Sequence, residues 1–411
     1  MARRTALLAC ETGTGRGHVV TLAGVARVLV GHWDCVAALS RLEYAAVLSL
    51  HARAVHLAPV MARRPDAEVL APRPAPLPPR RLPDFAGRSV YWADSWVNWI
   101  GRRGFRDVAR LRAQVAFWQD MIWRTQAELV VTDYAPAALL AARALGVPSV
   151  VTGTAIGIAP LGIPRFPVFP TAPGAVLLDE DETAALISEA VAPLGGPPLA
   201  RLAELYTATL ALPRGFPAWD PYGEWRQERL LLPLEEHPPR ATGRGDRVFA
   251  YLSTTEFQEP GIVEALRRLP LPVTMFAPGL PEADAAALRA ANPRLRISKA
   301  PLPVAEIVAS ARLILNAGQA GTAALAMLAG IPMLALPQHN EHAANARGAV
   351  ALGGHRLLYR PERSAEAIQS ALLAMWEDSA LSAAAQRVAG RLRAQTPRGA
   401  LEETREALVR F

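Results

Sequence analysis

The chain has 411 residues, 44 basic and 37 acidic side chains, and a net charge of +7. Its hydrophobic content of 51% excludes a disordered protein, and its length provides for two domains, each with its own core. All but one of the basic residues are Arg, and they are scattered, whereas a nucleic-acid interface needs them clustered. We therefore expect no nucleic acid as a partner.

The two cysteines, Cys10 and Cys35, exclude a disulfide framework and a cysteine-based metal site. Arginines interrupt every apolar run before it reaches the length of a membrane span, so no integral membrane segment is expected. The N-terminus carries two arginines before about five apolar residues, which is short of the roughly seven that a secretory signal needs. We expect a cytoplasmic protein, and nothing in the sequence indicates its oligomeric state.

Strand-like and helical runs alternate from the start of the chain. The first unit is a strand over 5–9, a glycine-rich loop over 11–17, and a helix that continues to Val30. A later unit has a strand over 128–132, a helix over 136–145 and a strand over 149–152. This alternation predicts an α/β fold with parallel sheets.

A composition shift marks the middle of the chain. Residues 213–246 are rich in Pro and polar residues, and only 228–234 resemble a strand. We therefore place a domain boundary there and predict an N-terminal Rossmann-like domain over 1–233 and a C-terminal one over 234–390. The last residues, 391–411, are predicted to form a basic amphipathic helix.

The second half of the chain repeats the alternation. It begins with a strand over 247–252, a helix over 259–269 and a strand over 273–276. An apolar strand over 313–315 then leads into a small-residue turn, Asn316 to Gly321, and a helix stopped by Gly330. The first turn of a helix offers unpaired N–H groups and partial positive charge, which bind phosphate, and small residues let the phosphate approach the backbone.

A further strand over 331–336 precedes a polar cluster, Gln338 to His342. The turn 316–322 and the segment 337–342 together resemble the donor-binding segment of GT-B glycosyltransferases. That family usually has His-Gly-Gly-x-Gly-Thr-Thr at the turn and Pro-x-x-x-Asp/Glu-Gln after the strand. Here Asn316 replaces the usual His, and His342 replaces the usual Gln.

The resemblance implies the GT-B fold, in which two Rossmann-like domains face each other across a cleft. It also implies that the 391–411 helix packs back on the N-terminal domain. The loop before His18 is similar to the Gly-x-Gly-x-Gly-His pattern of the same enzymes, so Gly15 and Gly17 are expected in an acceptor or phosphate loop.

Two residues are candidates for acid–base chemistry. The resemblance implies that His18 deprotonates the acceptor hydroxyl, for which an imidazole with a pKa near 6.5 is suited. Asp133 would orient that imidazole, as the carboxylate does in a Ser-His-Asp triad. The alternatives are that His18 only binds phosphate or caps the loop, and that Asp133 is the N-cap of the helix at 136.

The donor diphosphate is expected on the N–H groups of Gln319, Ala320 and Gly321 and on the Thr322 hydroxyl. Alternatively, this turn only joins a strand to a helix. The resemblance implies that Glu341 accepts hydrogen bonds from sugar hydroxyls, unless it is an exposed loop carboxylate. The remaining candidate donor-binding residues are Asn316, Gly318, His342, Ser253 and Thr254. For Ser253 and Thr254 the alternative is a turn that caps a helix.

Many relatives hold the ribose hydroxyls with a Glu two residues beyond Thr322, where this chain has Ala324. We therefore expect TDP-sugars to be accepted alongside UDP-sugars. Trp92 and Trp96 share a helical face and are candidates for an acceptor pocket, or else for ordinary core packing. The acidic run 179–182 is interpreted as a helix start rather than a metal site, and no metal cofactor is expected.

The sequence thus predicts an inverting glycosyltransferase. It would move a hexose from a UDP- or TDP-sugar to a hydroxyl of a small, apolar or aromatic acceptor. Two alternatives remain: a nucleotide-sugar hydrolase or epimerase on the same fold, and a binding or auxiliary protein that has lost catalysis.

Overall fold

The computed structural model describes residues 3–12, 16–61, 95–167, 178–252, 256–409 and 411. The chain forms two compact units. Unit 1 comprises Met1–Gly215, Pro221–Leu231 and Leu401–Phe411, and unit 2 comprises Phe216–Asp220 and Leu232–Ala400. Each unit is built around its own parallel sheet, which confirms the predicted α/β class with two Rossmann-like halves.

Unit 1 contains a six-stranded parallel sheet in the order β3-β2-β1-β4-β5-β6. Its central strands are buried on both faces, which is why they read in the sequence as almost continuous apolar runs. The strands are β1 (Arg4–Cys10), β2 (Trp33–Leu39), β3 (Ala52–Leu57), β4 (Ala127–Asp133), β5 (Ser149–Thr154) and β6 (Leu210–Arg214).

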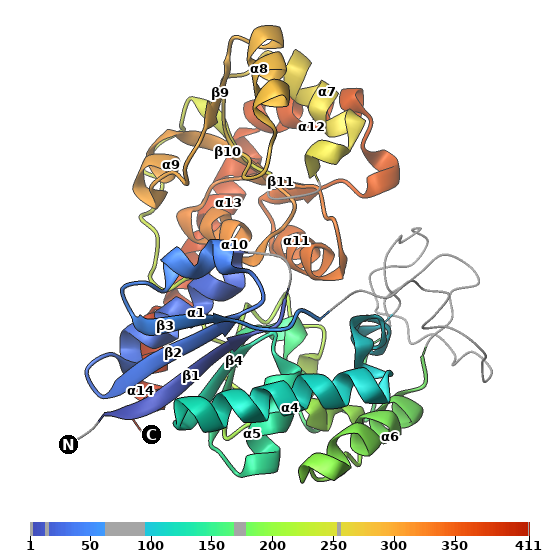
Figure 1. The fold of residues 1–411 in the computed structure, drawn as a ribbon. Helices are drawn as coiled ribbons and strands as arrows, with labels where there is room; N and C mark the ends of the chain where they lie inside the picture. The colour runs from blue at the N-terminus through green and yellow to red at the C-terminus, as the bar shows by residue number, and fades with distance from the viewer. Residues whose placement is uncertain (1–2, 13–15, 62–94, 168–177, 253–255, 410) are drawn as a thin grey trace. The chain divides into compact units, whose positions relative to one another are not determined.

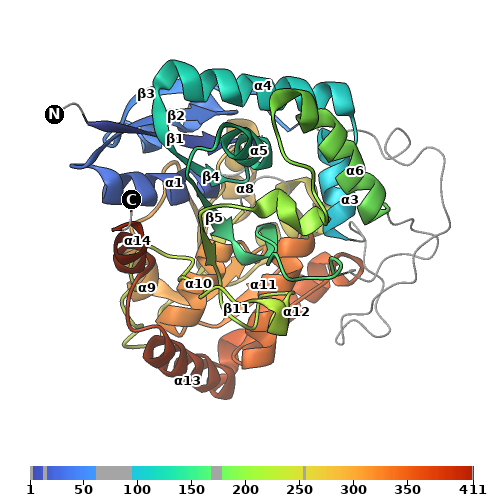
Figure 2. The same cartoon turned by 90° about the horizontal axis from the view of Figure 1, so that it is seen from below.

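Helices cover both faces of this sheet. Helices α4 and α5 pack against each other on one face, and α1 lies on the other (Figure 1; Figure 2). Helix α5 begins with Pro at its first position and ends at Gly146, whose left-handed backbone closes it. The helices of unit 1 are α1 (Arg16–Leu29), α3 (Trp96–Ile100), α4 (Val108–Thr125), α5 (Pro136–Leu145), α6 (Glu180–Val191) and α14 (Ala400–Leu408).

Unit 2 has a second six-stranded parallel sheet, in the order β12-β11-β10-β7-β8-β9. Its strands are β7 (Arg247–Tyr251), β8 (Val273–Phe276), β9 (Leu295–Ser298), β10 (Ala311–Asn316), β11 (Met333–Ala335) and β12 (His355–Leu357). Its helices are α7 (Pro260–Arg268), α8 (Glu282–Ala291), α9 (Val304–Ser310), α10 (Ala320–Ala329), α11 (Asn340–Leu352), α12 (Ala365–Glu377) and α13 (Ser379–Gln395).

Both sheets have the same topology. In unit 1 the chain adds β2 and β3 on one side of β1 and then adds β4 on the other side; in unit 2, β7 and β10 are related in the same way. The carboxyl ends of strands at such a reversal form the ligand crevice of an open α/β sheet. The topology therefore indicates that ligands bind near the loop after β1, the end of β4 and the turn after β10.

Two sequence expectations are wrong. Residues 228–234 form no strand; one isolated bridge joins Leu231 to Arg214, and Pro233 has no N–H to extend it. Residues 391–411 do not form one helix, because Pro397 and Gly399 separate α13 from α14. Helix α13 lies in unit 2, and α14 lies in unit 1 apart from its first residue.

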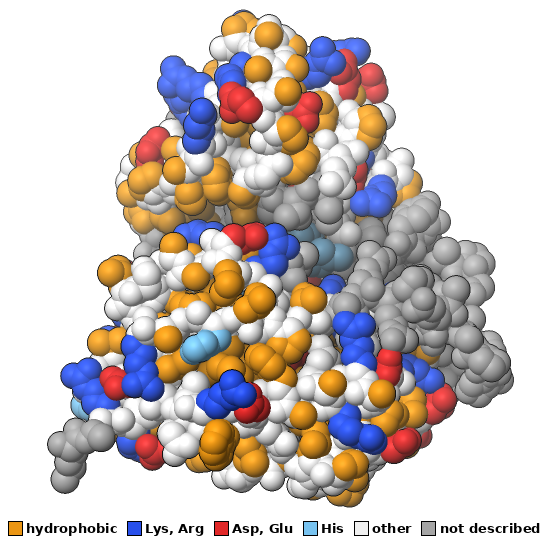
Figure 3. Space-filling view, viewed as in Figure 1, with side chains coloured by type: hydrophobic (Ala, Val, Ile, Leu, Met, Phe, Trp, Pro, Cys, Tyr) orange, Lys and Arg blue, Asp and Glu red, His pale blue; other side chains and the backbone are white. Residues whose placement is uncertain are grey.

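On the face drawn in Figure 3, arginines alternate with acidic and apolar side chains and do not gather into one basic patch. No helix within the described ranges combines the length and apolarity needed to cross a membrane.

Candidate functional site

The topological reversal in unit 1 brings His18 and Asp133 together. Helix α1 begins at Arg16, so its first turn holds His18, whose side chain is 21% exposed. Asp133 is the last residue of β4, the strand beside β1, and its side chain is 1% exposed. The two are joined by a hydrogen bond of 3.0 Å between His18 Nδ1 and Asp133 Oδ1.

A glycine on the neighbouring strand leaves space for the carboxylate of Asp133. Gly153 on β5 has φ +130°, and a Cβ there would lie 2.6 Å from Asp133 Oδ1. The alternative in which Asp133 caps α5 is wrong, because Ala135 occupies the N-cap position and no side chain caps it. Asp133 Oδ2 is buried and has no hydrogen-bond partner among the described residues, so Oδ1 carries its contact with His18.

A second carboxyl group, Glu11, was not predicted. It directly follows β1 and is fully buried, and its Oε1 accepts a hydrogen bond of 3.1 Å from the N–H of Ala138 in the first turn of α5. Burial raises the pKa of Glu11 to about 8, although helix N–H groups oppose the shift. Its place at the carboxyl end of β1, beside Asp133 at the end of β4, is the signal that could have identified it.

Aromatic side chains line the other side of the imidazole. The ring centroids of His18 and Tyr134 are 4.6 Å apart, and Tyr134 meets Trp96 and Trp99 edge-on. Those two indoles stack with centroids 4.5 Å apart. Trp96 is buried and donates from Nε1 to the Tyr206 hydroxyl over 2.5 Å, so it is held in the core while contacting the residue beside His18.

The turn after β10 is stabilised by its own side chains. Gly318 has φ +92°, and a Cβ there would lie 2.5 Å from the carbonyl oxygen of His342. Asn316 Oδ1 accepts a hydrogen bond of 2.5 Å from the Gly318 N–H, and Asn345 Nδ2 donates to the Gly318 carbonyl over 3.0 Å. The amide nitrogen of Asn316 is buried without a hydrogen-bond partner among the described residues.

The N-terminus of α10 is accessible. Gln319 occupies the N-cap position without capping the helix through its side chain, and residues 319–322 are only partly buried. The Gln319 side chain accepts a hydrogen bond from the Ala317 N–H over 3.0 Å and donates to Glu256 Oε1 over 2.8 Å. The first N–H groups of α10, including those of Ala320 and Gly321, therefore have no intrahelical acceptor.

The polar cluster after β11 opens α11. Glu341 is partly exposed in the first turn of that helix, whereas His342 is buried. Burial lowers the pKa of His342 well below its usual value, with smaller contributions from His339 and Arg363, so its imidazole is neutral at pH 7. The rings of His339 and His342 lie 3.6 Å apart.

The segment before α11 is fixed by Arg363, which the sequence did not single out. Its side chain is 1% exposed and donates to the carbonyls of Pro337 and Leu358. Its Nη1 also lies 3.1 Å from each carboxylate oxygen of Glu259. A buried guanidinium thus ties the end of β11 to the residue before α7.

Four predicted site residues, Gly15, Trp92, Ser253 and Thr254, lie outside the described residues. Gly17 is exposed, with open space around it.

The acidic run 179–182 begins α6: Asp179 accepts the Glu182 N–H, Glu180 accepts the Phe166 N–H and Asp181 pairs with Arg165. Within the described part of the chain, no three His, Cys, Asp or Glu side chains gather in a metal-binding arrangement.

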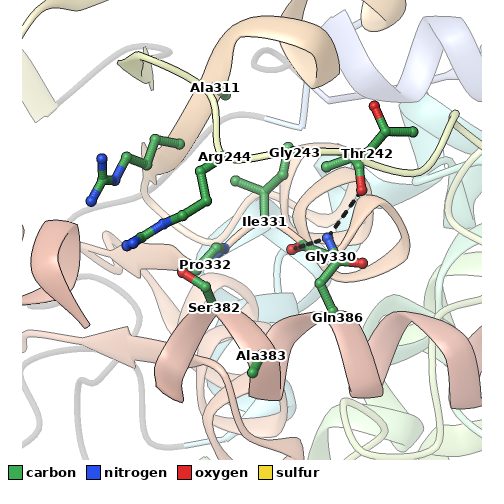
Figure 4. Close-up of a pocket in the computed structure, with 12 residues that line it drawn as sticks. Thr242, Gly243, Arg244, Ala311, Gly330, Ile331, Pro332, Ser382, Ala383 and Gln386 are labelled. Atoms are coloured by element: carbon green, nitrogen blue, oxygen red, sulfur yellow. Dashed lines mark hydrogen bonds between the residues drawn. The ribbon is translucent and has the colours of Figure 1, made fainter. Parts of the chain in front are cut away.

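A cavity of about 360 Å³ in unit 2 contains none of the predicted site residues (Figure 4). It lies at the amino ends of β10 and β11, the opposite edge of the sheet from Asn316. Arg244 and Arg312 line it, and both donate to the carbonyl of Trp376 near the end of α12. Cations at a helix C-terminus stabilise its dipole, which gives these arginines a structural role.

Comparisons with known proteins agree with this geometry. Residues 279–403 match the family described as "Erythromycin biosynthesis protein CIII-like, C-terminal domain". No curated protein matches the sequence.

Three solved structures share the fold. The glycosyltransferase VinC in complex with DTDP has 17% identity and a TM-score of 0.66, covering 99% of this chain and 98% of its own. The spinosyn rhamnosyltransferase SpnG complexed with thymidine diphosphate has 16% identity and a TM-score of 0.62, covering 95% and 96%. The glycosyltransferase SnogD from Streptomyces nogalater has 16% identity and a TM-score of 0.58, covering 100% of both chains.

The chain therefore has the GT-B fold, and residues 279–403 match the erythromycin biosynthesis protein CIII-like family. The GT-B fold that the turn 316–322 led us to expect is confirmed by these structures.

Proposed function

We propose that this protein transfers a hexose from a nucleoside diphosphate sugar to a hydroxyl group of a small natural product, with inversion at the anomeric carbon. The observation that carries the proposal is the hydrogen bond of 3.0 Å between His18 and Asp133, at the topological reversal of unit 1. The accessible N-terminus of α10, at the matching reversal of unit 2, supplies a place for the diphosphate.

In this proposal His18 is the general base. Its Nδ1 is engaged by Asp133, so Nε2 takes the proton from the acceptor hydroxyl. The oxygen attacks the anomeric carbon from the face opposite the diphosphate, the carbon–oxygen bond to the diphosphate breaks, and His18 becomes an imidazolium. The buried Asp133 carboxylate stabilises that cation and fixes the reactive tautomer.

The leaving diphosphate is stabilised by backbone dipoles. The N–H groups of Gln319, Ala320 and Gly321 start α10, where partial positive charge favours an anion. The buried amide nitrogen of Asn316 is a further donor at this turn that needs an acceptor. We expect these groups, rather than a metal ion, to offset the diphosphate charge, and Glu341 to bind sugar hydroxyls.

A thymidine nucleotide fits the site at least as well as a uridine nucleotide. Ala324 is fully buried on α10, so that position offers no carboxylate to the ribose, whose 2′-hydroxyl is present in UDP and absent in TDP. VinC and SpnG were both solved with thymidine diphosphate, and this supports the same choice here.

The acceptor is expected to be apolar or aromatic. Tyr134, Trp96 and Trp99 form an aromatic cluster beside His18. Aromatic side chains offer large, rigid contact surfaces to planar rings.

The test is a thermal-shift panel of TDP, UDP and GDP with the purified chain. A nucleotide present at 100 times its Kd stabilises the folded state by about 2.7 kcal/mol. We expect TDP to raise the melting temperature at least as much as UDP, and GDP to raise it less. The absence of a shift with any of the three would contradict the proposed donor site, and a response to UDP alone would contradict the thymidine assignment.

A further inference from the structure

The backbone at Tyr134 has a conformation that bulky residues avoid. Within the described residues, only Gln126 and Tyr134 combine a side chain with a positive φ, at 53° and 49°. Gln126 closes the C-terminus of α4, where this conformation is common. Tyr134 instead follows strand β4 directly, so helix capping does not explain its conformation. Such conformations are found preferentially at functional sites, where the surrounding structure enforces them.

The phenol ring of Tyr134 has several contacts in this conformation. The ring lies against the His18 imidazole, with centroids 4.6 Å apart and planes inclined by 52°. It also meets the indoles of Trp96 and Trp99 edge-on, with centroids 6.0 and 5.7 Å away. Its hydroxyl lies 3.0 Å from Thr154 Oγ1 at the end of β5. The ring is therefore held at its hydroxyl and by three neighbouring rings.

Two glycines leave room for this arrangement. A Cβ at Gly157 would lie 2.6 Å from the Tyr134 ring, and a Cβ at Gly153 would lie 2.6 Å from Asp133 Oδ1. Both distances are shorter than real Cβ contacts allow. A side chain at Gly153 would therefore displace Asp133, and a side chain at Gly157 would displace the Tyr134 ring.

We infer that Tyr134 is a positioning residue for the imidazole of His18. Asp133 fixes the direction of one ring nitrogen by a hydrogen bond. Contact with the Tyr134 ring constrains the tilt of the imidazole plane and so the direction of Nε2. This inference rests on the proposed function, in which Nε2 takes the acceptor proton.

The experiment compares four variants. Tyr134→Asn keeps a residue that tolerates a positive φ and removes the ring; Tyr134→Phe keeps the ring and removes the hydroxyl. Gly157→Ala displaces the ring without changing Tyr134. Gln126→Asn is the matched control, because it makes an equivalent change at the other positive-φ position, on the exposed end of α4. Transfer to an acceptor found by mass spectrometry is measured together with ¹⁵N spectra of the His18 ring.

We expect Tyr134→Asn and Gly157→Ala to lower kcat by about 10- to 100-fold with little change in the KM for the nucleotide sugar, since small displacements of a catalytic group have effects of this size. Tyr134→Phe should restore most of the activity, and Gln126→Asn should behave as wild type. In the ¹⁵N spectra, the two impaired variants should lose the single Nδ1–H tautomer or broaden its signals.

Wild-type kcat and an unchanged His18 spectrum in both Tyr134→Asn and Gly157→Ala would overturn the inference. The spectra also separate it from the proposed function. If wild type transfers no sugar but the Tyr134 variants still alter the His18 signals, the positioning role holds and glycosyl transfer fails.

Discussion

Asp133 is buried, and its Oδ1 accepts the hydrogen bond from His18. Asp133→Asn keeps the shape of the side chain but removes the charge that favours the Nδ1–H tautomer and the imidazolium. We expect kcat to fall by about 10²- to 10⁴-fold, while the Kd for TDP stays unchanged. Steady-state kinetics and calorimetry measure the two quantities. If the affinity for TDP falls by the same factor as kcat, the substitution has disturbed the structure beyond the orientation of His18.

The raised pKa of Glu11 predicts that the stability of the fold depends on pH. Its pKa is about 8 in the folded chain against an ordinary value of 4.5, so the folded state favours the protonated form. The corresponding stabilisation is complete below about pH 4.5 and is lost as the pH rises to about 8.

We therefore expect the melting temperature of wild type to fall relative to that of Glu11→Gln between pH 5 and pH 8.5. The difference corresponds to a free energy on the order of a few kcal/mol. If the melting temperatures of wild type and Glu11→Gln instead change by the same amount across this pH range, the pKa of Glu11 is not raised in the folded chain.

The sequence was informative about single residues where a family motif marked them. It indicated the His18–Asp133 pair, and the structure brings the two within hydrogen-bonding distance. It did not indicate Glu11, Tyr134 or Arg363, because their importance depends on which strands are neighbours. Asn316 and Gln319 belong to the predicted turn, but their side-chain partners also become visible only in three dimensions.

Among the elements, the turn between β10 and α10 contains one glycine that the fold requires and another that we expect to matter only for nucleotide binding. Gly318 has a positive φ and no room for a Cβ, whereas the nearest atom to a Cβ at Gly321 is Leu234 Cδ2, at 3.9 Å. Gly318→Ala should therefore destabilise the fold by about 1–3 kcal/mol. Gly321→Ala should keep the melting temperature of wild type and bind TDP more weakly, because its methyl group occupies the path to the helix N–H groups.

Denaturant titration and calorimetry on the two variants provide the check. Tight TDP binding by Gly321→Ala would place the diphosphate somewhere other than the N-terminus of α10.

Most elements could be predicted because parallel strands buried on both faces give apolar runs that end at turn residues. Helix α5 and strand β8 have the predicted bounds, 136–145 and 273–276. The segment 228–234 was misread because an apolar run beside an edge strand does not by itself form a ladder. The 391–411 helix was misread because its amphipathic pattern continues across the Pro397 break.

At the scale of the whole molecule, the C-terminus closes onto the start of the chain. Arg4 on β1 donates to the carbonyl of Phe411, and Glu403 on α14 is buried and paired with Arg229. Leu408 is buried at the end of α14, whereas its neighbour Val409 is 80% exposed.

We expect Leu408→Ala to lower the free energy of unfolding by about 2–4 kcal/mol and Val409→Ala to change it by less than about 0.5 kcal/mol. Equilibrium unfolding in urea measures both variants. Equal effects of the two substitutions would mean that α14 contributes no packing to unit 1.

Sugar transfer by the proposed mechanism requires a base in unit 1 and a nucleotide site in unit 2. The most direct test is sugar transfer from a TDP-hexose at saturating concentration, followed by mass spectrometry with a panel of phenolic and polyketide acceptors. We predict a product heavier by one hexose residue with wild type, and a loss of at least about 10²-fold in its rate with His18→Ala. Product formed at the wild-type rate by His18→Ala would contradict the account.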